Sequence, residues 1–333
     1  MAPLLEVKNL DVRFAVRGGD LTALRGISFS LDKGERLGLV GESGAGKSVA
    51  AFSILRLIAQ PGYIAGGEVL FEGRNLATMS EKELRRIRGN RIAMIFQDPM
   101  MTLNPVLTIG TQMVEALKAH RRISTKAARD IALNKLKKVY IPSPEKRLEQ
   151  YPHELSGGMR QRVIIAIALL LDPEIIIADE PTTALDVTIQ AEIMALLLEL
   201  CEQENVALML ITHDLGVVSQ VTQHMLVMYS GRIIEQGPTR EIINDAQHPY
   251  TQGLINALPQ MGEPGRRLYQ IPGSMPSLKN VPSGCPFHPR CQYATDLCAR
   301  KMPDYVHSGN VDVACHEVRK LIEQEKQLQE MSS

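Results

Sequence analysis

Hydrophobic and polar positions alternate with two different periods along this chain, which predicts a mixed α/β fold. Four short runs with apolar centres lie at residues 36–40, 92–96, 174–180 and 206–212. Runs without polar alternation are typical of strands that are buried on both faces of a parallel sheet. The chain is therefore expected to build its core around such a sheet.

Apolar residues at helical spacing predict helices between these strands. Strand 174–180, helix 188–204 and strand 206–212 in succession imply a right-handed crossover, and hence parallel strands. A charged helix is expected at residues 80–91, where Ser80 and Glu83 have the spacing of a capping box. Its basic run either contacts phosphate or forms a solvated face. Further helices are predicted at residues 49–58, 109–119, 127–139 and 163–171.

Other patterns predict β structure and subdomains outside the central sheet. Residues 4–31 alternate in pieces around a Gly-rich turn, which predicts antiparallel strands, and hairpins are expected at 66–73 and 227–237. Helical patterns dominate after residue 98. The predicted core has two parts, residues 1–97 and 162–237. A helical subdomain is inserted between them at residues 98–161, and an extension rich in Pro and Gly follows at residues 238–333.

Composition narrows the function classes. Lys plus Arg and Asp plus Glu both total 37, so the net charge is zero and no global field attracts nucleic acid or anionic lipid. The longest apolar stretch, residues 163–171, is far shorter than the roughly 20 residues that cross a bilayer. The first residues lack the pattern of a signal peptide. A cytosolic chain is expected, and any membrane role must come through partners.

Residues 41–48, Gly-Glu-Ser-Gly-Ala-Gly-Lys-Ser, have the spacing of a phosphate-binding loop between a strand and a helix. Gly41, Gly44 and Gly46 allow backbone N–H groups to face an anion, and the helix N-terminus adds a partial positive charge. Lys47 is expected at the β- and γ-phosphates and the Ser48 hydroxyl at Mg²⁺. The other nucleotide contacts predicted here are Glu42, Ser43, Ala45 and Val49.

Phe14 has two interpretations. It ends an alternating strand pattern, so it is either a core or edge aromatic or a face on which adenine stacks.

Four of the five cysteines, Cys285, Cys291, Cys298 and Cys315, lie within the last fifty residues. In a reducing cytosol such clustering favours a metal site over disulfides. Four thiolates suit zinc or an iron–sulfur cluster, although the short C-x-x-C spacing of structural zinc is missing. An iron–sulfur cluster, zinc and unligated thiols all remain open, as does a redox or metal sensor. Cys201 is expected in the core.

Five separated elements occur in a fixed order along the chain. They are Lys47, Gln97, the turn Ser156-Gly157-Gly158, the acids Asp179-Glu180, and His213. Together they resemble the ATP-binding subunits of ABC transporters over nearly the whole chain. The resemblance implies a P-loop NTPase (RecA-like) core with an antiparallel β layer, an inserted helical subdomain and a cysteine-bearing C-terminal extension.

The resemblance also implies roles in ATP hydrolysis. Asp179 is expected to bind Mg²⁺ through water, together with Ser48 and Gln97. Glu180 is similar to the family's catalytic base, and His213 to the residue that contacts the γ-phosphate and holds the base and water. Gln97 would also pass the state of the γ-phosphate to the helical subdomain. Outside this context, the adjacent acids would be an ion pair or cap, and His213 a core residue.

A second anion cradle is expected where Ser156, Gly157 and Gly158 begin a helix. In the family, this turn completes the ATP site of another subunit. Two ATP molecules would therefore lie between two head-to-tail ATPase subunits, with Asp186 of the segment 184–186 near the opposite site. Whether the second subunit is identical or a paralogue is left open.

Residues 247–254, Gln-His-Pro-Tyr-Thr-Gln-Gly-Leu, and the cysteine-bearing tail are similar to the extension of ATPases from oligopeptide and dipeptide importers. That similarity implies a [4Fe-4S] cluster at the cysteines. The implied partners are a second ATPase subunit, two membrane permeases and an extracytoplasmic peptide-binding protein. The chain itself is expected at the cytoplasmic face of the bacterial inner membrane, held there by the permeases. The segment from His248 is expected to be an ordered loop that caps the next helix, in preference to any ligand role.

Other functions remain open at this point. Nickel and opine importers share parts of the same extension. A soluble ABC ATPase acting on DNA or ribosomes is a further alternative, but such proteins fuse two ATPase units or insert long coiled coils. This chain has one unit and no sustained heptads, and no nucleic-acid partner is expected.

Overall fold

The computed structural model describes residues 2–98, 102–183, 185–258 and 270–318. It divides into two compact units. The first takes its residues from 1–30, 36–77 and 211–333, and the second from 31–35 and 78–210. The four-segment division of the chain stays a prediction, since these units group the extension with the phosphate-binding loop.

The first unit contains the expected antiparallel β layer. Its strands β1 (Leu5–Val16), β2 (Gly19–Leu31), β4 (Gly62–Phe71) and β5 (Arg74–Asn75) run in the order β2-β1-β4-β5. Strand β1 pairs with β4 in antiparallel register from Leu5 opposite Phe71 to Phe14 opposite Gly62. The alternating pattern at the N-terminus and the hairpin near residue 70 are therefore confirmed.

A second sheet of this unit continues into the extension. Strand β3 (Arg36–Val40) is parallel to β9 (His224–Tyr229), which forms the expected hairpin with β10 (Arg232–Pro238). Strands β12 (Val311–Val313) and β11 (Val306–Ser308) add to the edge of β10. The extension thus returns to the core sheet, although such short strands leave no periodic signal in the sequence.

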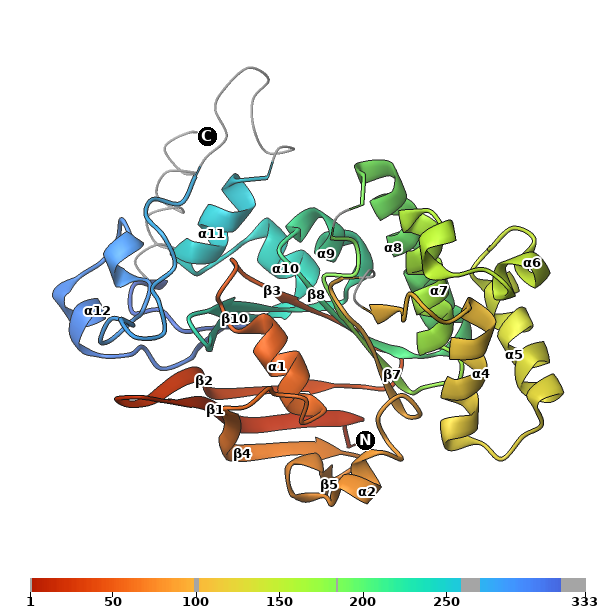
Figure 1. Ribbon diagram of the computed structural model, residues 1–333. Helices are drawn as coiled ribbons and strands as arrows, with labels where there is room; N and C mark the ends of the chain where they lie inside the picture. The colour runs from red at the N-terminus through yellow and green to blue at the C-terminus, as the bar shows by residue number, and fades with distance from the viewer. Residues whose placement is uncertain (1, 99–101, 184, 259–269, 319–333) are drawn as a thin grey trace. The chain divides into compact units, whose positions relative to one another are not determined.

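Helix α1 (Lys47–Ile54) lies between the two sheets of the first unit (Figure 1). The remaining helical pieces of this unit are short. They are η1 (Leu76–Thr78), α9 (Leu215–Val221), α10 (Thr239–Asn244), α11 (Pro249–Asn256), η4 (His288–Arg290) and α12 (Asp296–Arg300).

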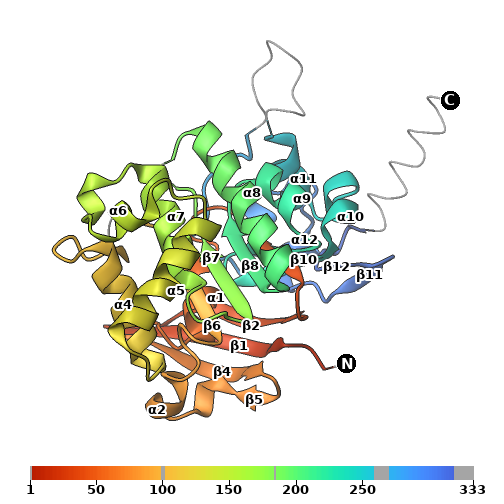
Figure 2. The same ribbon diagram turned by 90° about the vertical axis from the view of Figure 1, so that its right-hand side faces the viewer.

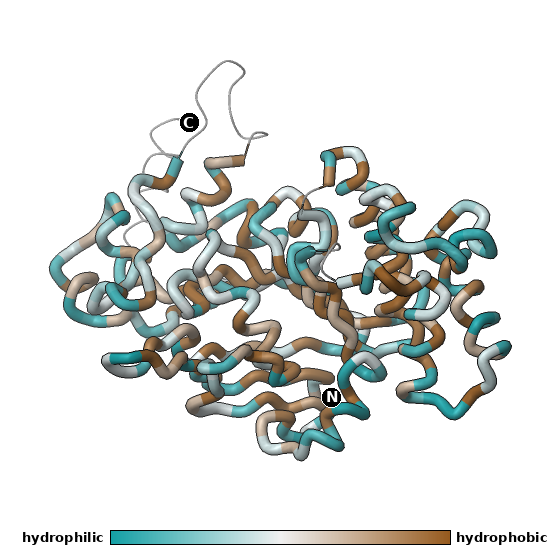
Figure 3. The backbone as a smooth tube through the Cα atoms, in the orientation of Figure 1, coloured by the Kyte–Doolittle hydropathy of each residue, from teal (hydrophilic) through white to brown (hydrophobic). Residues whose placement is uncertain are grey.

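The second unit is built on strands in the order β8-β7-β6, namely β8 (Ala207–Thr212), β7 (Ile175–Asp179) and β6 (Ile92–Ile95). Strands β6 and β7 are parallel, and every residue of β7 and β8 is buried. Continuous apolar runs therefore form strands covered on both faces, as predicted. These central strands are mainly brown in Figure 3.

Helices form the rest of the second unit, and two views show α4, α5, α6 and α7 gathered side by side (Figures 1 and 2). The side chains of Thr108, Ser124, Ser156 and Asp186 cap α4, α5, α7 and α8. Each satisfies a backbone N–H that the first helical turn leaves open. The bounds are α4 (Ile109–His120), α5 (Thr125–Lys138), α6 (Pro144–Leu148), η2 (Pro152–Glu154), α7 (Gly157–Ala168) and α8 (Val187–Glu204).

The charged helix expected at residues 80–91 was predicted too long. Helix α2 covers only Glu81–Leu84, although the capping box of Ser80 and Glu83 is present. Gly89 has a φ of +72° and its N–H donates to the Ile92 carbonyl, so the chain turns into β6 instead of continuing the helix. The basic run forms ion pairs, Arg88 with Glu81 and Arg91 with Glu174, which favours the solvated face.

Among the described residues, no helix has the length and hydropathy needed to cross a membrane.

Replacement of Gly38 by alanine tests how closely α9 packs on β3. A Cβ at Gly38 would lie 2.7 Å from Val218 Cγ1 and 3.2 Å from Thr222 Oγ1. The helix must shift, and we expect the free energy of unfolding to fall by about 1–3 kcal/mol in urea denaturation. Gly66→Ala is the matched control, because its nearest atom is 4.0 Å away; a change within about 0.5 kcal/mol is expected there. Equal losses in both variants would contradict this packing.

Candidate functional site

The loop at residues 41–48 joins β3 to α1 in the first unit and packs tightly against β9. A Cβ at Gly41 would lie 2.4 Å from the Met228 carbonyl oxygen, so only glycine fits there. Gly46 is the N-cap of α1 and has a φ of +107°, in the left-handed region. Gly41 is therefore required because there is no space for a Cβ, and Gly46 because the backbone has a positive φ.

Lys47 begins helix α1 inside the loop that precedes it. Its side-chain Nζ donates to the carbonyl oxygens of Gly41, at 2.8 Å, and Glu42, at 3.1 Å, and the residue is 6 % exposed. Ser43 and Gly44 are exposed, while Ser48 and Val49 are half-buried in the first helical turn. A buried ammonium beside a helix N-terminus makes this loop suited to anions.

Two other predicted residues of the first unit lie at strand ends. Phe14 is half-buried, and its ring lies over Gly62 on the neighbouring strand β4. His213 follows β8 directly and is exposed, just before Asp214 caps helix α9. His213 is thus not a core residue, and adenine stacking on Phe14 stays a prediction.

In the second unit, the adjacent acids end the buried strand β7. Asp179 is 2 % exposed, and Glu180 is half-buried with a φ of +45°, a conformation that costs a non-glycine residue energy. The Glu180 carboxylate accepts from Gln97 Nε2 at 3.1 Å and from Thr183 Oγ1 at 3.0 Å. The structure therefore brings Gln97 and Glu180 together, and it adds Thr183, which no sequence motif had indicated.

The turn at residues 156–158 begins helix α7 in the same unit. Ser156 Oγ accepts from the Met159 N–H at 3.4 Å, and Ser156 and Gly157 are exposed. A Cβ at Gly158 would lie 2.9 Å from Ile189 on α8, so this glycine is required by packing. The exposed N-terminus of a twelve-residue helix is a second place suited to an anion.

Asp186 is the N-cap of α8, and its carboxylate accepts from the Ile189 N–H at 2.9 Å. Its predicted neighbour Ala184 lies outside the described residues.

Comparison with known proteins identifies the family. The family described as "ABC transporter" matches residues 24–183. A probable peptide ABC transporter ATP-binding protein of Sinorhizobium fredii is 52% identical over 303 residues, 90% of each chain. The chain belongs to the ABC transporter family. The family described as "Oligopeptide/dipeptide transporter, C-terminal region" also matches, over residues 234–298.

Further ABC transporter proteins align over most of the chain. The dipeptide transport ATP-binding protein DppD of Haemophilus influenzae is 48% identical, covering 94% of this chain and 95% of its own. A dimeric structure of the ABC transporter cassette MJ0796 has a TM-score of 0.64 at 29% identity, covering 71% of this chain and 99% of that one. A post-hydrolysis structure of the same cassette holds ADP and phosphate. The chain therefore has the ABC ATPase fold, with ATP and Mg²⁺ as its ligands and ATP hydrolysis as its activity.

The four clustered cysteines line one small cavity of the first unit, while Cys201 is buried in α8 as expected. A Cβ at Gly284 would lie 2.3 Å from the Cys298 carbonyl oxygen, and the Cys285 N–H donates to that carbonyl at 2.8 Å. These contacts hold two of the four cysteine segments side by side. Burial raises the pKa of Cys285 to about 11 and that of Cys315 to about 12.

Whether the cavity fits a metal centre depends on donor chemistry and on size. His248 lines the cavity, and its Nδ1 accepts from the Tyr250 N–H at 3.0 Å, which leaves the proton of the neutral ring on Nε2. That N–H is buried with no partner among the described residues, and it suits an anionic sulfur group. The chemistry fits, but the cavity volume is only about 10 Å³, and no described set of three or more side chains stands at metal-ligand positions. A cluster or zinc ion requires the sulfur atoms to rearrange.

His248 also confirms the capping interpretation of its segment, because it is the N-cap of α11. Burial lowers the pKa of His248 to about 3 and raises that of Glu235 to about 7. The Glu235 carboxylate accepts the N–H groups of Gln247 and His248, at 2.7 and 3.2 Å. The extension is thus anchored on β10 at a fully buried position.

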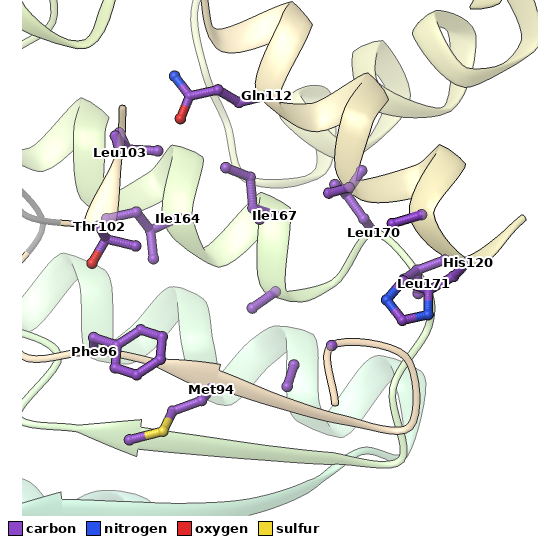
Figure 4. A pocket seen from close by; sticks show the side chains of 15 residues that line it. Met94, Phe96, Thr102, Leu103, Gln112, His120, Ile164, Ile167, Leu170 and Leu171 are labelled. Atoms are coloured by element: carbon purple, nitrogen blue, oxygen red, sulfur yellow. The ribbon is translucent and has the colours of Figure 1, made fainter. Parts of the chain in front are cut away.

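An apolar pocket of about 310 Å³ lies in the second unit between β6 and helices α4 and α7. Figure 4 shows Phe96 and Met94 on one side, with Ile164 and Ile167 across from them. Phe96 is 38 % exposed and directly precedes Gln97. The sequence offered no signal for this pocket, because its lining combines residues from distant segments.

Substitution of two helix caps separates stability from catalysis. Ser156→Ala and Ser124→Ala each remove the side-chain cap of one helix of the second unit, and each is expected to lower the free energy of unfolding by about 1 kcal/mol. Only Ser156→Ala should reduce ATP hydrolysis, by roughly 100-fold, because its hydroxyl would contact a transferring phosphoryl group. Urea denaturation and phosphate release measure the two effects. Equal hydrolysis rates in the two variants would contradict a role for Ser156 beyond capping.

Proposed function

We propose that this chain is the ATP-hydrolysing subunit of a bacterial ABC importer for dipeptides or oligopeptides. The observation that carries the proposal is the match of residues 234–298 to the C-terminal region of oligopeptide/dipeptide transporters. Relatives named for dipeptide and oligopeptide transport support it, because they align with about 90% of the chain, extension included. Nickel or opine import has no comparable support.

The site residues divide the work of hydrolysis. Lys47 and the loop N–H groups bind the β- and γ-phosphates, and Ser48, Asp179 and Gln97 hold Mg²⁺ directly or through water. Glu180 orients and polarises the attacking water as general base. Its hydrogen bond from Gln97 supports a joint role for these two side chains.

ATP is hydrolysed by a head-to-tail pair of ATPase subunits. Ser156, Gly157 and Gly158 complete the ATP site of the partner subunit, Asp186 lies near that site, and His213 contacts the γ-phosphate. The exposure of Ser156 and Gly157 supports this arrangement, because residues that contact a partner's nucleotide must be accessible in the single chain. The dimeric structure of a related cassette supports it further. The partner subunit is a paralogue or a second copy.

Two permease subunits and an extracytoplasmic peptide-binding protein complete the importer, and this chain binds to the permeases at the cytoplasmic face of the inner membrane. We assign the apolar pocket beside Phe96 to apolar side chains of a permease subunit. Its volume of about 310 Å³ suits a few apolar side chains, and the adjoining Gln97 contacts Glu180. Movement of the permease residues bound in this pocket would therefore be transmitted through Phe96 and Gln97 to the catalytic base, Glu180.

The cysteines of the extension hold a metal centre, with a [4Fe-4S] cluster as the first candidate and zinc as the alternative. Cys285, Cys291, Cys298 and Cys315 would supply the thiolates, and the His248 Nε2–H would donate to a sulfur atom. The shared cavity and the unpaired buried N–H support this proposal. When bound, the centre would cross-link the four cysteine segments of the extension.

Replacement of Glu180 by glutamine tests the catalytic assignment. We expect ATP hydrolysis to fall at least 100-fold while ATP binding persists, because the amide keeps its size but cannot act as a base. Cells carrying the variant should also fail to import a radiolabelled dipeptide. Glu115→Gln, at an exposed position of α4, is the control and should leave both rates unchanged. Hydrolysis at the wild-type rate would refute the base assignment, and stimulation by nucleic acid rather than by permeases would refute the importer.

Replacement of Cys298 by serine tests the metal centre. Anaerobically purified wild-type protein is expected to contain iron and acid-labile sulfide, and Cys298→Ser to lose most of both. Cys201→Ser is the matched control, since Cys201 is equally buried but lies in α8 of the other unit. Zinc in place of iron would select the alternative, and a wild-type protein without either metal would contradict the proposal.

A further inference from the structure

The phosphate-binding loop carries an acidic side chain, Glu42, at its second position. A carboxylate close to a site for a triphosphate repels the ligand, because like charges about 10 Å apart still interact by a few tenths of a kcal/mol or more, even in water. The residue is 31 % exposed by its side chain, so solvent covers only part of it. Unless a nearby positive charge compensates the Glu42 carboxylate, the triphosphate is therefore bound more weakly.

Arg290 supplies the compensating charge from the far end of the chain. Its Nη1 lies 2.6 Å from Glu42 Oε2 and its Nη2 3.0 Å from Oε1, which is a two-pronged ion pair. The Arg290 side chain is only 6 % exposed. This carboxylate holds the pKa of Arg290 above its usual value, so the guanidinium stays charged.

The position of Arg290 is fixed by the extension around it. Its Nε donates to the Pro272 carbonyl at 2.8 Å and its Nη1 to the Tyr229 hydroxyl at 3.3 Å. The guanidinium also lies 5.9 Å from the ring centroids of Tyr229 and Phe287. Because Nε, Nη1 and Nη2 all donate hydrogen bonds, the Arg290 side chain has little freedom to move away from Glu42.

The backbone of Glu42 is held by the same extension. Its N–H donates to the Tyr250 hydroxyl at 2.8 Å. Tyr250 is fully buried, and its ring packs edge-on against Tyr229, with ring centroids 4.8 Å apart, and at a tilt against Phe287, with centroids 5.4 Å apart. The side chain and the backbone of Glu42 are therefore both bound by residues of the extension, and Tyr229 of β9 contacts both of these residues.

We propose that Arg290 acts on ATP binding through Glu42: it neutralises the carboxylate beside the phosphate-binding loop, so that the extension sets the affinity for ATP. The inference rests on the proposed role of residues 41–48 in holding the triphosphate. It requires no metal in the cysteine cavity. Cys291 follows Arg290 directly in the chain, so changes in the cysteine segment would reach the loop through this side chain.

The test compares Arg290→Gln with the double variant Glu42→Gln/Arg290→Gln in the full chain. Isothermal titration with Mg²⁺ and the non-hydrolysable analogue AMP-PNP measures Kd. Arg290→Gln should raise Kd about three- to tenfold, because Glu42 is left uncompensated beside the triphosphate. The double variant should return to within about twofold of wild type, because the repelling charge is gone. The rise in Kd should be smaller for ADP and should shrink in 1 M salt, where the screening length is about 3 Å.

Control variants separate this role from simple support of the fold. Arg290→Lys keeps the charge and should retain most of the affinity, and Arg300→Gln, an exposed arginine of α12, should match wild type. Thermal unfolding of each variant shows whether it folds. A double variant as weak as Arg290→Gln, or an unchanged Kd in Arg290→Gln, would overturn the inference. If the wild type does not bind AMP-PNP, or if Lys47→Ala binds it as tightly as the wild type, the proposed role of the loop is overturned instead.

Discussion

Tight backbone packing of the phosphate-binding loop is the constraint on which the rest of the first unit depends. At Gly41 no Cβ can be accommodated, because the Met228 carbonyl stands 2.4 Å from its position. At the other end, the N–H of Gly231 donates to the Ala45 carbonyl at 2.8 Å. The loop is thus bound to the β9–β10 hairpin before any ligand arrives, and a cradle fixed in advance loses little entropy on binding an anion.

Much of this fold was predictable because its central strands are buried on both faces. Three isoleucines in a row at the start of β7 leave few alternatives, and the adjacent acids at its end then fall where ligands bind in parallel sheets. The glycine spacing of residues 41–48 was equally informative. In these places local sequence and tertiary environment impose the same requirement.

Other features depend on contacts between distant residues and left no local signal. Glu42 and Arg290 are 248 positions apart, and neither side chain has a spacing that points to the other. Strands β11 and β12 have three residues each, too few to show a period. At residues 80–91 a local signal was present but misleading. The charged composition is typical of a helix, but Gly89 adopts a positive φ and turns the chain into β6.

The short pairing of β12 with β10 has a consequence for the protein's behaviour in the crowded cell. Glu235 and Gln236 of β10 lie opposite Val313 and Asp312, so β12 covers the middle of this edge of the hairpin. An uncovered sheet edge is a template for strands of other molecules. Strands β11 and β12 therefore also protect part of the β10 edge from pairing with other molecules, and cleavage ahead of residue 306 would expose that edge even with the nucleotide-binding loop intact.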